Sequence, residues 1–322
     1  MNLRQFRYIS EIAKHDLNVS AAASALHTSQ PGISKQVKLL ETELGAEIFV
    51  RSSNRFSGIT PLGQKIIGMA RNIITEAANI KAASEDLKQE QSGLLVIATT
   101  HTQARYVLPE IMKCFSVRYP KVQLTLRHGD PTGISELLLS GKADIGVTTE
   151  TAQHLRELLV LPCRRFQRVV IVPRGHELLN RKRLTLKVLA EYPLVTYEPA
   201  FTGRRQLEKA FEREGLKPKL VLSAIDADVI KSCVEHGLGI AVLSEVTYNQ
   251  NVDSGLCSIP AGHLFEPSVT CIAIDRQRYL RRYAYDFIEM CAPPWNRANV
   301  QRATTLSRSR LSTRAKVAEA SS

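Results

Sequence analysis

The chain of 322 residues lacks the features of several large classes of protein. No apolar run approaches the roughly 18 residues of a membrane span, and the N-terminus is amphipathic, without the apolar core of a signal peptide. The six cysteines are dispersed, with no CxxC pair and no histidine at metal-binding spacing. The sequence therefore predicts a cytoplasmic protein with reduced structural thiols and no metal.

The chain also lacks the short motifs of common enzymes. It contains no GxSxG nucleophile elbow, no Walker-type phosphate loop and no HExxH metal helix. His101 stands in a polar segment without a candidate nucleophile or metal ligand beside it. We expect no catalytic residue and no enzyme, although product formation from candidate sulfur esters would revive that alternative.

Positive charge is abundant but unevenly distributed. The formal net charge is +12, of which residues 1–65 carry only +3 and residues from Arg276 onward carry +7. The basic end, residues 293–322, is rich in Ser, Thr and Ala, and this composition predicts disorder. Such a tail either attracts phosphates without sequence preference or is only solvated.

Residues 18–38, NVSAAASALHTSQPGISKQVK, have the pattern of two short helices joined by a tight turn. Two apolar stripes at helical spacing allow the helices to pack crosswise, Ser29 can cap the second helix, and Pro31 suits its first turn. Any helical hairpin could share this pattern, but its outward polar face suits the major groove of DNA. The predicted DNA-contacting residues of this second helix are Ser29, Gln30, Pro31, Ser34, Lys35 and Lys38.

The flanking segments complete a winged helix-turn-helix over residues 1–60. An amphipathic helix precedes the pair, and residues 48–59 alternate as a basic two-stranded wing. Arg51 and Arg55 of the wing suit phosphate or minor-groove contacts, although a basic hairpin can also be a solvated edge.

A long helix is predicted over residues 61–90, because Thr60 and Pro61 form a helix start. Ile66, Ile73, Ile80 and Leu87 recur every seven residues, with Met69, Ala70, Ala77 and Ala83 in the adjoining seam. This is a short coiled-coil pattern and predicts dimerisation. The alternative is that the stripe packs onto its own domain.

Beyond Gly93 strands alternate with helices, including one helix expected over residues 103–119, and this indicates an α/β domain with a mainly parallel sheet. We expect two lobes with a cleft, in a domain over residues 91–292. Lobe 1 takes residues 91–162 and 268–292, and lobe 2 takes residues 163–267.

Hydroxyl side chains gather where predicted strands give way to helices. Thr99 to Gln103 follow one strand, Thr149 ends another, and Thr202 opens a helix with Gly203. Hydroxyls and free backbone N–H groups at helix starts suit an anion, and strand ends in one sheet edge meet at a crevice. Because Thr caps helices widely, three such sites could also be coincidence.

Across about residues 1–292 the chain resembles the LysR-type transcriptional regulators, and most specifically their CysB-like branch, which governs bacterial sulfur assimilation. The matching segments are TSQPGISKQV (28–37), IATTHTQARY (97–106), YPLVTY (192–197), FTGR (201–204) and DADVIK (226–231). The resemblance implies a homotetramer with a two-lobed, periplasmic-binding-protein-like effector domain. It also implies that the anion site is lined by Thr100, Thr102, Gln103, Thr149 and Thr202, while Arg105 adds charge or makes an internal salt bridge.

We therefore expect a regulator of sulfate, cysteine or sulfonate genes that binds double-stranded promoter DNA. The effector is expected to be a small anion such as sulfate, acetylserine or adenosine phosphosulfate, with no resident cofactor. RNA polymerase is a further expected partner, and a membrane is not. The alternatives are a LysR-type regulator of another pathway and a solute-binding protein for small anions.

Overall fold

The computed structural model describes residues 1–52, 55–87, 92–149 and 158–307, and the chain divides into two units. The first unit is Met1–Gln89 with the short segment Gln277–Tyr279, and the second is Glu90–Arg276 with Leu280–Ser322. Among the described helices, none is both long and apolar enough to cross a membrane.

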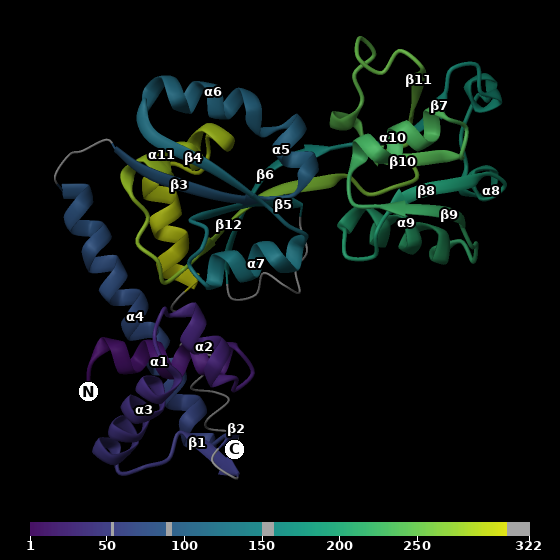
Figure 1. Cartoon of the computed structure of the whole chain (residues 1–322). Helices are drawn as coiled ribbons and strands as arrows, with labels where there is room; N and C mark the ends of the chain where they lie inside the picture. The colour runs from purple at the N-terminus through teal and green to yellow at the C-terminus, as the bar shows by residue number, and fades with distance from the viewer. Residues whose placement is uncertain (53–54, 88–91, 150–157, 308–322) are drawn as a thin grey trace. The chain divides into compact units, whose positions relative to one another are not determined.

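The first unit is a winged helix-turn-helix, as the sequence predicts (Figure 1). Asn2, Asn18 and Ser29 each cap one of its first three helices with a side-chain oxygen, which satisfies a backbone N–H of the first turn. The two wing strands pair antiparallel. The elements are α1 Leu3–Lys14, α2 Val19–Ala25, α3 Gln30–Leu44, β1 Phe49–Ser52 and β2 Arg55–Ile59.

The apolar stripes of these helices meet in one core. Ile9 and Ile12 of α1 are fully buried against Ala22 of α2 and Ile33 and Val37 of α3. Burial of each large aliphatic side chain contributes about 1.5 to 3 kcal/mol, so this core stabilises the crossing of α2 and α3. The crossing leaves the opposite face of α3 in solvent.

Helix α4, Pro61–Leu87, follows the wing without a break. Thr60 Oγ1 accepts a hydrogen bond of 2.8 Å from the Gly63 N–H, which starts the helix as predicted. Gly63 is required by close approach, because a Cβ there would lie 2.1 Å from the Ile48 carbonyl oxygen. Ile67 and Ala70 of the first turns are buried in the helix-turn-helix core.

The second unit begins with lobe 1, a five-stranded sheet in the order β4-β3-β5-β12-β6. Helices α6 and α11 cover one face of this sheet and α7 covers the other. The strands are β3 Ser92–Thr99, β4 Lys121–His128, β5 Ile145–Thr149, β6 Leu158–Phe166 and β12 Ser268–Asp275. The helices are α5 His101–Tyr106, α6 Leu108–Arg118, α7 Pro131–Leu139 and α11 Arg282–Cys291.

Lobe 2 of the second unit is another five-stranded sheet, in the order β11-β7-β10-β8-β9. Helices α8 and α9 pack on one face and α10 on the other. The strands are β7 Arg168–Pro173, β8 Pro193–Tyr197, β9 Lys219–Ala224, β10 Ile240–Ser244 and β11 Leu256–Pro260. The helices are α8 Leu186–Ala190, α9 Thr202–Arg213 and α10 Ala227–Glu235, with 3-10 turns η1 Glu177–Asn180 and η2 Glu245–Thr247.

The two-lobed α/β architecture is confirmed, but three details differ from expectation. Each sheet is mixed, with two parallel and two antiparallel strand pairs, rather than mainly parallel. The helix expected over residues 103–119 is two helices, because Pro109 in the first turn of α6 starts a new helix. The expected lobe boundary at 162/163 falls inside β6, which stays in lobe 1 to Phe166.

The expectation that residues 293–322 are disordered is wrong for residues 297–307, which are helical. Val300 is fully buried in the lobe 1 core, and Trp295 packs against that core and donates a hydrogen bond of 2.8 Å from Nε1 to the Pro162 carbonyl. Two apolar anchors outweigh the polar composition around them. Residues 308–322 lie outside the described residues.

Candidate DNA-reading face and effector cleft

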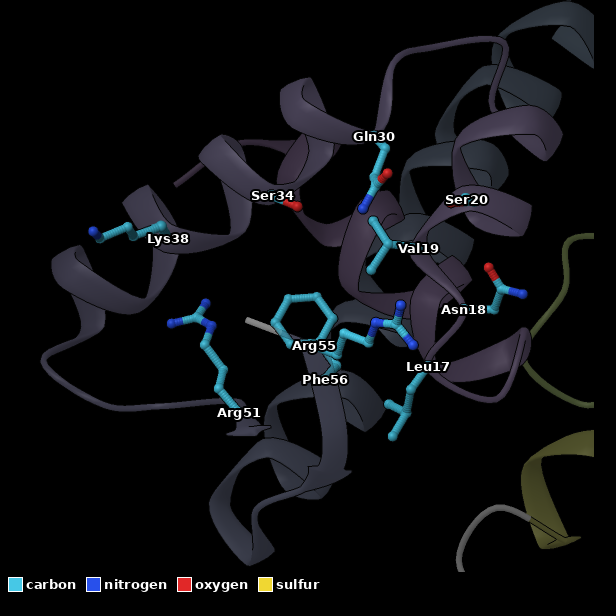
Figure 2. A pocket seen from close by; sticks show the side chains of 10 residues that line it. All are labelled: Leu17, Asn18, Val19, Ser20, Gln30, Ser34, Lys38, Arg51, Arg55 and Phe56. Atoms are coloured by element: carbon cyan, nitrogen blue, oxygen red, sulfur yellow. The ribbon is translucent and has the colours of Figure 1, made fainter. Parts of the chain in front are cut away.

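The first unit carries a groove of about 670 Å³ between α3, the start of α2 and the wing. Figure 2 shows the side chains of α3 and of the wing facing one another across it. Five predicted DNA-contacting residues line this groove together, namely Gln30, Ser34, Lys38, Arg51 and Arg55. A concave face with amide, hydroxyl and three cationic groups can contact base edges and phosphates at once.

The other three predicted residues lie on the same helix but outside the groove lining. Ser29 is the N-cap of α3 and accepts a hydrogen bond of 3.3 Å from the Gly32 N–H. Pro31 occupies the first turn, and Lys35 is exposed. Starting helix α3 is therefore a sufficient structural role for Ser29 and Pro31.

Arg51 is engaged within the protein. Its Nη2 lies 2.5 Å from Oε2 of Glu41, and its guanidinium lies 5.3 Å from the ring centre of Phe56. Glu41 is only 6% exposed and also accepts hydrogen bonds from the Ile48 and Phe49 N–H groups. Arg51 thus fixes the wing against α3. Arg55 is the wing cation that has no acidic partner among the described residues.

Sequence reasoning missed the contribution of α2 to this groove. Asn18 and Ser20 at the start of α2 line it beside Gln30. Asn18 Oδ1 accepts a hydrogen bond of 3.0 Å from the Ala21 N–H, so its amide nitrogen is available to a phosphate. Asn18, as a helix cap, could have indicated this contribution in the sequence, because helix N-termini attract phosphates.

We expect Gln30→Ala and Ser34→Ala to weaken specific promoter binding by about 1 to 3 kcal/mol each if the side chain contacts a base edge. Both residues are on the solvent side of α3, so stability should change little. Electrophoretic mobility shift on promoter and scrambled DNA measures the effect. Gln64→Ala, on an exposed residue of α4, is the matched control, and equal losses on both DNAs would contradict base reading.

The second unit holds a small cavity of about 40 Å³ between its two lobes. All five predicted effector residues line it, with Thr100, Thr102, Gln103 and Thr149 from lobe 1 and Thr202 from lobe 2. Gln103 is 1% exposed, and its Oε1 accepts a hydrogen bond of 3.2 Å from the Thr270 hydroxyl. The Gln103 amide group is thereby oriented with its N–H groups as donors.

Arg168, which sequence reasoning missed, also lines the cavity. Its side chain is buried, with the residue 4% exposed, and Nη2 donates a hydrogen bond of 2.5 Å to Oε1 of Gln206. No carboxylate of the described residues pairs with it. Burial lowers the pKa of Arg168 by desolvation, yet guanidinium stays protonated in proteins. The cavity therefore contains a positive charge with no counter-charge among the described residues.

The start of α9 also favours an anion in this cavity. Thr202 and Gly203 line the cavity, and the N-cap residue Phe201 supplies no side-chain acceptor to the first turn. A Cβ on Gly203 would lie 2.9 Å from the Tyr197 ring and 3.5 Å from Nη1 of Arg168. Glycine is needed for this packing, which brings the positive end of the helix dipole beside the guanidinium.

Two further polar atoms at the cavity have no hydrogen-bond partner in the part of the chain that the structure describes. Ser244 Oγ and His101 Nδ1 are shielded from solvent and make no hydrogen bond within the described structure. Thr100 is the N-cap of α5 but does not use its hydroxyl as a cap. The alternative that these hydroxyls merely cap helices therefore fails for Thr100. Buried polar groups without partners are uncommon and favour a bound ligand.

Lobe contacts next to the cavity run from α5 to lobe 2. The Thr102 and Tyr197 hydroxyls lie 3.4 Å apart, and the Tyr106 hydroxyl donates to Asp228. Arg105 Nε lies 3.4 Å from Asp228, so Arg105 makes the internal salt bridge expected as one alternative. Burial, together with the Asp228 hydrogen bond, raises the pKa of Tyr106 to about 12, so the phenol stays a donor.

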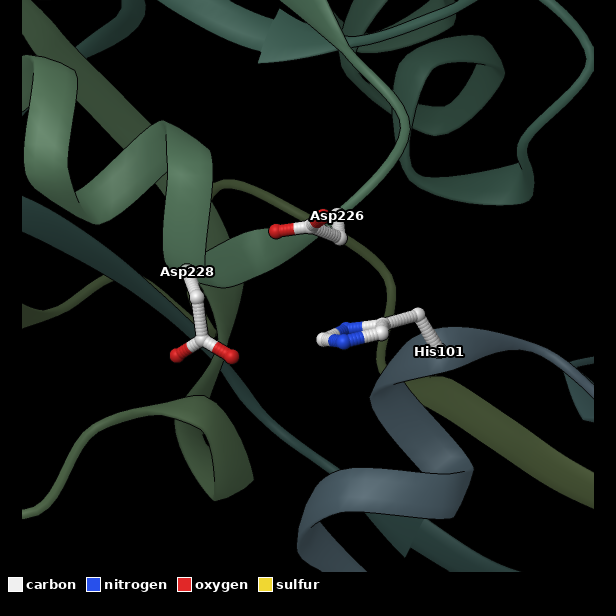
Figure 3. A group of neighbouring side chains, drawn as sticks. All are labelled: His101, Asp226 and Asp228. Atoms are coloured by element: carbon white, nitrogen blue, oxygen red, sulfur yellow. The ribbon is translucent and has the colours of Figure 1, made fainter.

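His101 faces the carboxylates of Asp226 and Asp228 across this contact (Figure 3), with one potential ligand atom from each within 4.8 Å of the others. Asp228 is already engaged by Tyr106 and by two cations, Arg105 and Lys231. Burial alone would raise the pKa of Asp228, but the Tyr106 hydrogen bond and the Lys231 and Arg105 charges lower it. The group is therefore a polar contact between lobes rather than a ready cation site.

The predicted dimerisation stripe of α4 has a part that packs on its own domain and a part that is exposed. Ile66 is half-buried against its own helix-turn-helix core, as the alternative reading expected, and the seam residue Ala70 is buried there. Ile73 and Ile80 are instead 42% and 67% exposed, with Met69 exposed on the same helix. Leu87 ends α4, but its side chain lies outside the described residues.

Comparisons with known proteins agree with both halves of the chain. Residues 3–64 match the bacterial regulatory helix-turn-helix protein, lysR family, and residues 88–293 match the LysR substrate binding domain. The chain is 45% identical over 306 residues to the transcriptional regulator CysB of Haemophilus influenzae, covering 95% of this chain and 94% of the relative. It is 42% identical over 300 residues to SsuR of Burkholderia cenocepacia, covering 93% and 97%.

A solved structure gives the same result for the second unit. The cofactor-binding domain of the Cbl transcriptional regulator superposes with a TM-score of 0.64 at 38% identity, covering 67% of this chain and 94% of that domain. These relatives are named as transcriptional regulators, which agrees with the expectation that the chain is not an enzyme. The chain belongs to the LysR family of DNA-binding, effector-responsive transcriptional regulators.

Proposed function

We propose that the protein controls sulfur-assimilation genes and that a small tetrahedral oxyanion, sulfate foremost, occupies the cavity between the lobes as its effector. The similarity to CysB, SsuR and Cbl regulators supports the pathway. The effector class rests on Arg168, whose buried guanidinium lies among hydroxyl donors and has no carboxylate partner in the described part of the chain. No resident cofactor is needed for this function.

The size of the cavity favours the smallest candidate. Its volume of about 40 Å³ accommodates a small ion. Drug-sized ligands occupy pockets of about 300 to 1,000 Å³. Acetylserine and adenosine phosphosulfate would require the lobes to separate, whereas sulfate would not.

The donors come from both lobes, so an anion between them would alter the relation of the lobes. Thr100 and Thr149 extend from lobe 1, while Arg168 and Thr202 extend from lobe 2. An anion that bonds to both sides stabilises the closed arrangement, and its affinity must be coupled reciprocally to that of any DNA-binding arrangement it favours.

The exposed part of the α4 stripe supports self-association. Isolated exposed isoleucines are common, but Ile73 and Ile80 recur at heptad spacing with Met69 beside them. Paired copies place two recognition helices on related half-sites of a promoter. We propose a dimer built on α4 that assembles into a homotetramer in the cytoplasm, with RNA polymerase as a further partner.

The double variant Ile73→Glu, Ile80→Glu should lose α4-mediated dimerisation, because four like charges would meet across a two-helix seam. Analytical ultracentrifugation should show smaller species, and promoter affinity should fall at least tenfold as the second half-site is lost. Since both side chains are exposed, the folding of each copy should be unaffected. Ala78→Glu on the same helix is the matched control, and unchanged mass in the double variant would exclude this stripe as the interface.

Sulfate titration of promoter binding tests the effector proposal. Sulfate is expected to change promoter affinity or DNA bending of the unmodified protein, and Thr100→Val should blunt that response while basal DNA binding is kept. Thr125→Val, in β4 away from the cavity, should behave as the unmodified protein. If acetylserine or adenosine phosphosulfate acts and sulfate does not, the proposed size selection is wrong. If none acts, the effector belongs to another pathway.

A further inference from the structure

A second, much larger groove lies on lobe 2, along α9. Its volume is about 840 Å³, and one wall is the α9 face that carries Arg205, Gln206 and Lys209. The segment 262–267 and Val269 form the opposite wall. Only Thr202 is shared with the lining of the small cavity. The groove therefore offers separate space for a ligand of another size.

The helix wall of the groove is basic. Arg205, Lys209 and Arg213 recur every four residues, which places them in one row on α9. Arg213 is paired with Glu266 at 3.0 Å, and both side chains are about two-thirds exposed. Neither Arg205 nor Lys209 has an acidic partner in the described part of the chain. Arg205 Nη2 is also shielded from solvent and makes no hydrogen bond there.

We propose that this groove is a second anion site, which takes a polyanionic small molecule of nucleotide size. The volume falls within the range of about 300 to 1,000 Å³ that such ligands occupy. Two unneutralised cations one helical turn apart can each form charge-assisted hydrogen bonds to a neighbouring phosphoryl group. The half-buried side chains of Leu264, Pro267 and Val269 on the other wall suit the less polar part of the molecule.

The same helix links this groove to the small cavity. Gln206 lines the groove and accepts the hydrogen bond from Arg168, while Thr202 lines both spaces. A ligand that draws Arg205 toward the groove acts on the same helical turn that orients Arg168. The two sites are therefore coupled, and each ligand changes the affinity of the other by the same factor.

Isothermal titration of the full-length protein with ADP tests the site, with adenosine as the uncharged comparison. ADP is expected to bind and adenosine is not. The double variant Arg205→Gln, Lys209→Gln should weaken ADP binding at least tenfold, and Lys209→Arg should retain it. The matched double variant Lys217→Gln, Lys219→Gln removes two exposed charges from the same lobe outside the groove and should have no effect.

The cavity variant Thr100→Val should leave ADP binding unchanged, since Thr100 lines only the small cavity. The sulfate affinity should shift when ADP is saturating, and this shift should vanish in the Arg205, Lys209 variant. Absence of ADP binding, equal loss in both double variants, or simple competition between ADP and sulfate would each overturn the proposal. A loss of promoter affinity in place of ADP binding would identify the groove as a DNA contact instead.

Discussion

Arg168→Met is expected to abolish the sulfate response of this regulator while leaving the unligated protein at least as stable as before. Hydrogen bonds to a charged group contribute about 1.5 to 3 kcal/mol each, so losing two of them weakens anion binding by a hundredfold or more. The stability of the unligated protein should not fall, because the guanidinium is buried with no carboxylate partner among residues 1–52, 55–87, 92–149 and 158–307. Replacing an uncompensated buried charge by an apolar side chain of similar length removes its desolvation penalty.

Two measurements distinguish an anion-binding role of Arg168 from a structural role. Isothermal titration gives the sulfate affinity, and thermal unfolding without sulfate gives the stability of the second unit. The single tryptophan, Trp295, packs against the lobe 1 core and serves as a fluorescence reporter. Gln206 loses its hydrogen-bond donor in the variant, and this loss reduces any gain in stability by about 1 kcal/mol. Arg164→Met, on an exposed β6 residue, is the matched control. A large loss of stability with normal sulfate affinity would show that Arg168 is a structural residue.

Glu41→Ala is expected to destabilise the first unit by about 2 to 6 kcal/mol, because two buried backbone N–H groups lose their acceptor at about 1 to 3 kcal/mol each. The variant leaves the Ile48 and Phe49 N–H groups and the Arg51 guanidinium without their acceptor. Because these bonds hold the wing on α3, promoter binding should be lost with the stability.

Hydrogen–deuterium exchange checks this prediction at the affected amides. The N–H groups of Ile48 and Phe49 should exchange faster in Glu41→Ala, and the second unit should be unaffected. Glu41→Gln should have an intermediate effect, since its amide oxygen can still accept the backbone bonds. Glu43→Ala is the matched control on the same helix, because Glu43 is 52% exposed and pairs with the N-terminal amine. Equal protection in Glu41→Ala and Glu43→Ala would exclude this role.

The elements that sequence reasoning predicted well depend on interactions within a few residues. Caps such as Ser29 and Thr60, a first-turn proline and apolar stripes at helical spacing are local, and the helices they predict are present. The hydroxyl cluster was also visible, since Thr100 and Thr202 each stand where a helix begins. Sequence spacing could not show that the two line one cavity, because about half of the effector domain separates them.

The features that were missed depend on partners far away in the chain. The expected boundary at 162/163 divided strand β6 between the lobes, but the whole strand pairs with β12 in lobe 1, over 100 residues later. Val300 and Trp295 lie in a polar segment, and only contact with the lobe 1 core makes Val300 buried and Trp295 partly buried. Arg168 is the first residue of an apolar strand. The neighbouring sequence does not distinguish it from a surface arginine, because burial depends on segments far away in the chain.

The sequence alone therefore determined the DNA-reading module, the long helix and the α/β character of the effector domain, since capping and periodicity are encoded in neighbouring residues. Tertiary structure decided which half of the α4 stripe stays exposed and which residues meet in the cavity. It also placed the buried Arg168 guanidinium among the hydroxyl groups, with no carboxylate of the described residues beside it. The physical reason is that burial and charge pairing are set by packing between distant segments, and these decide what an otherwise ordinary arginine or threonine can bind.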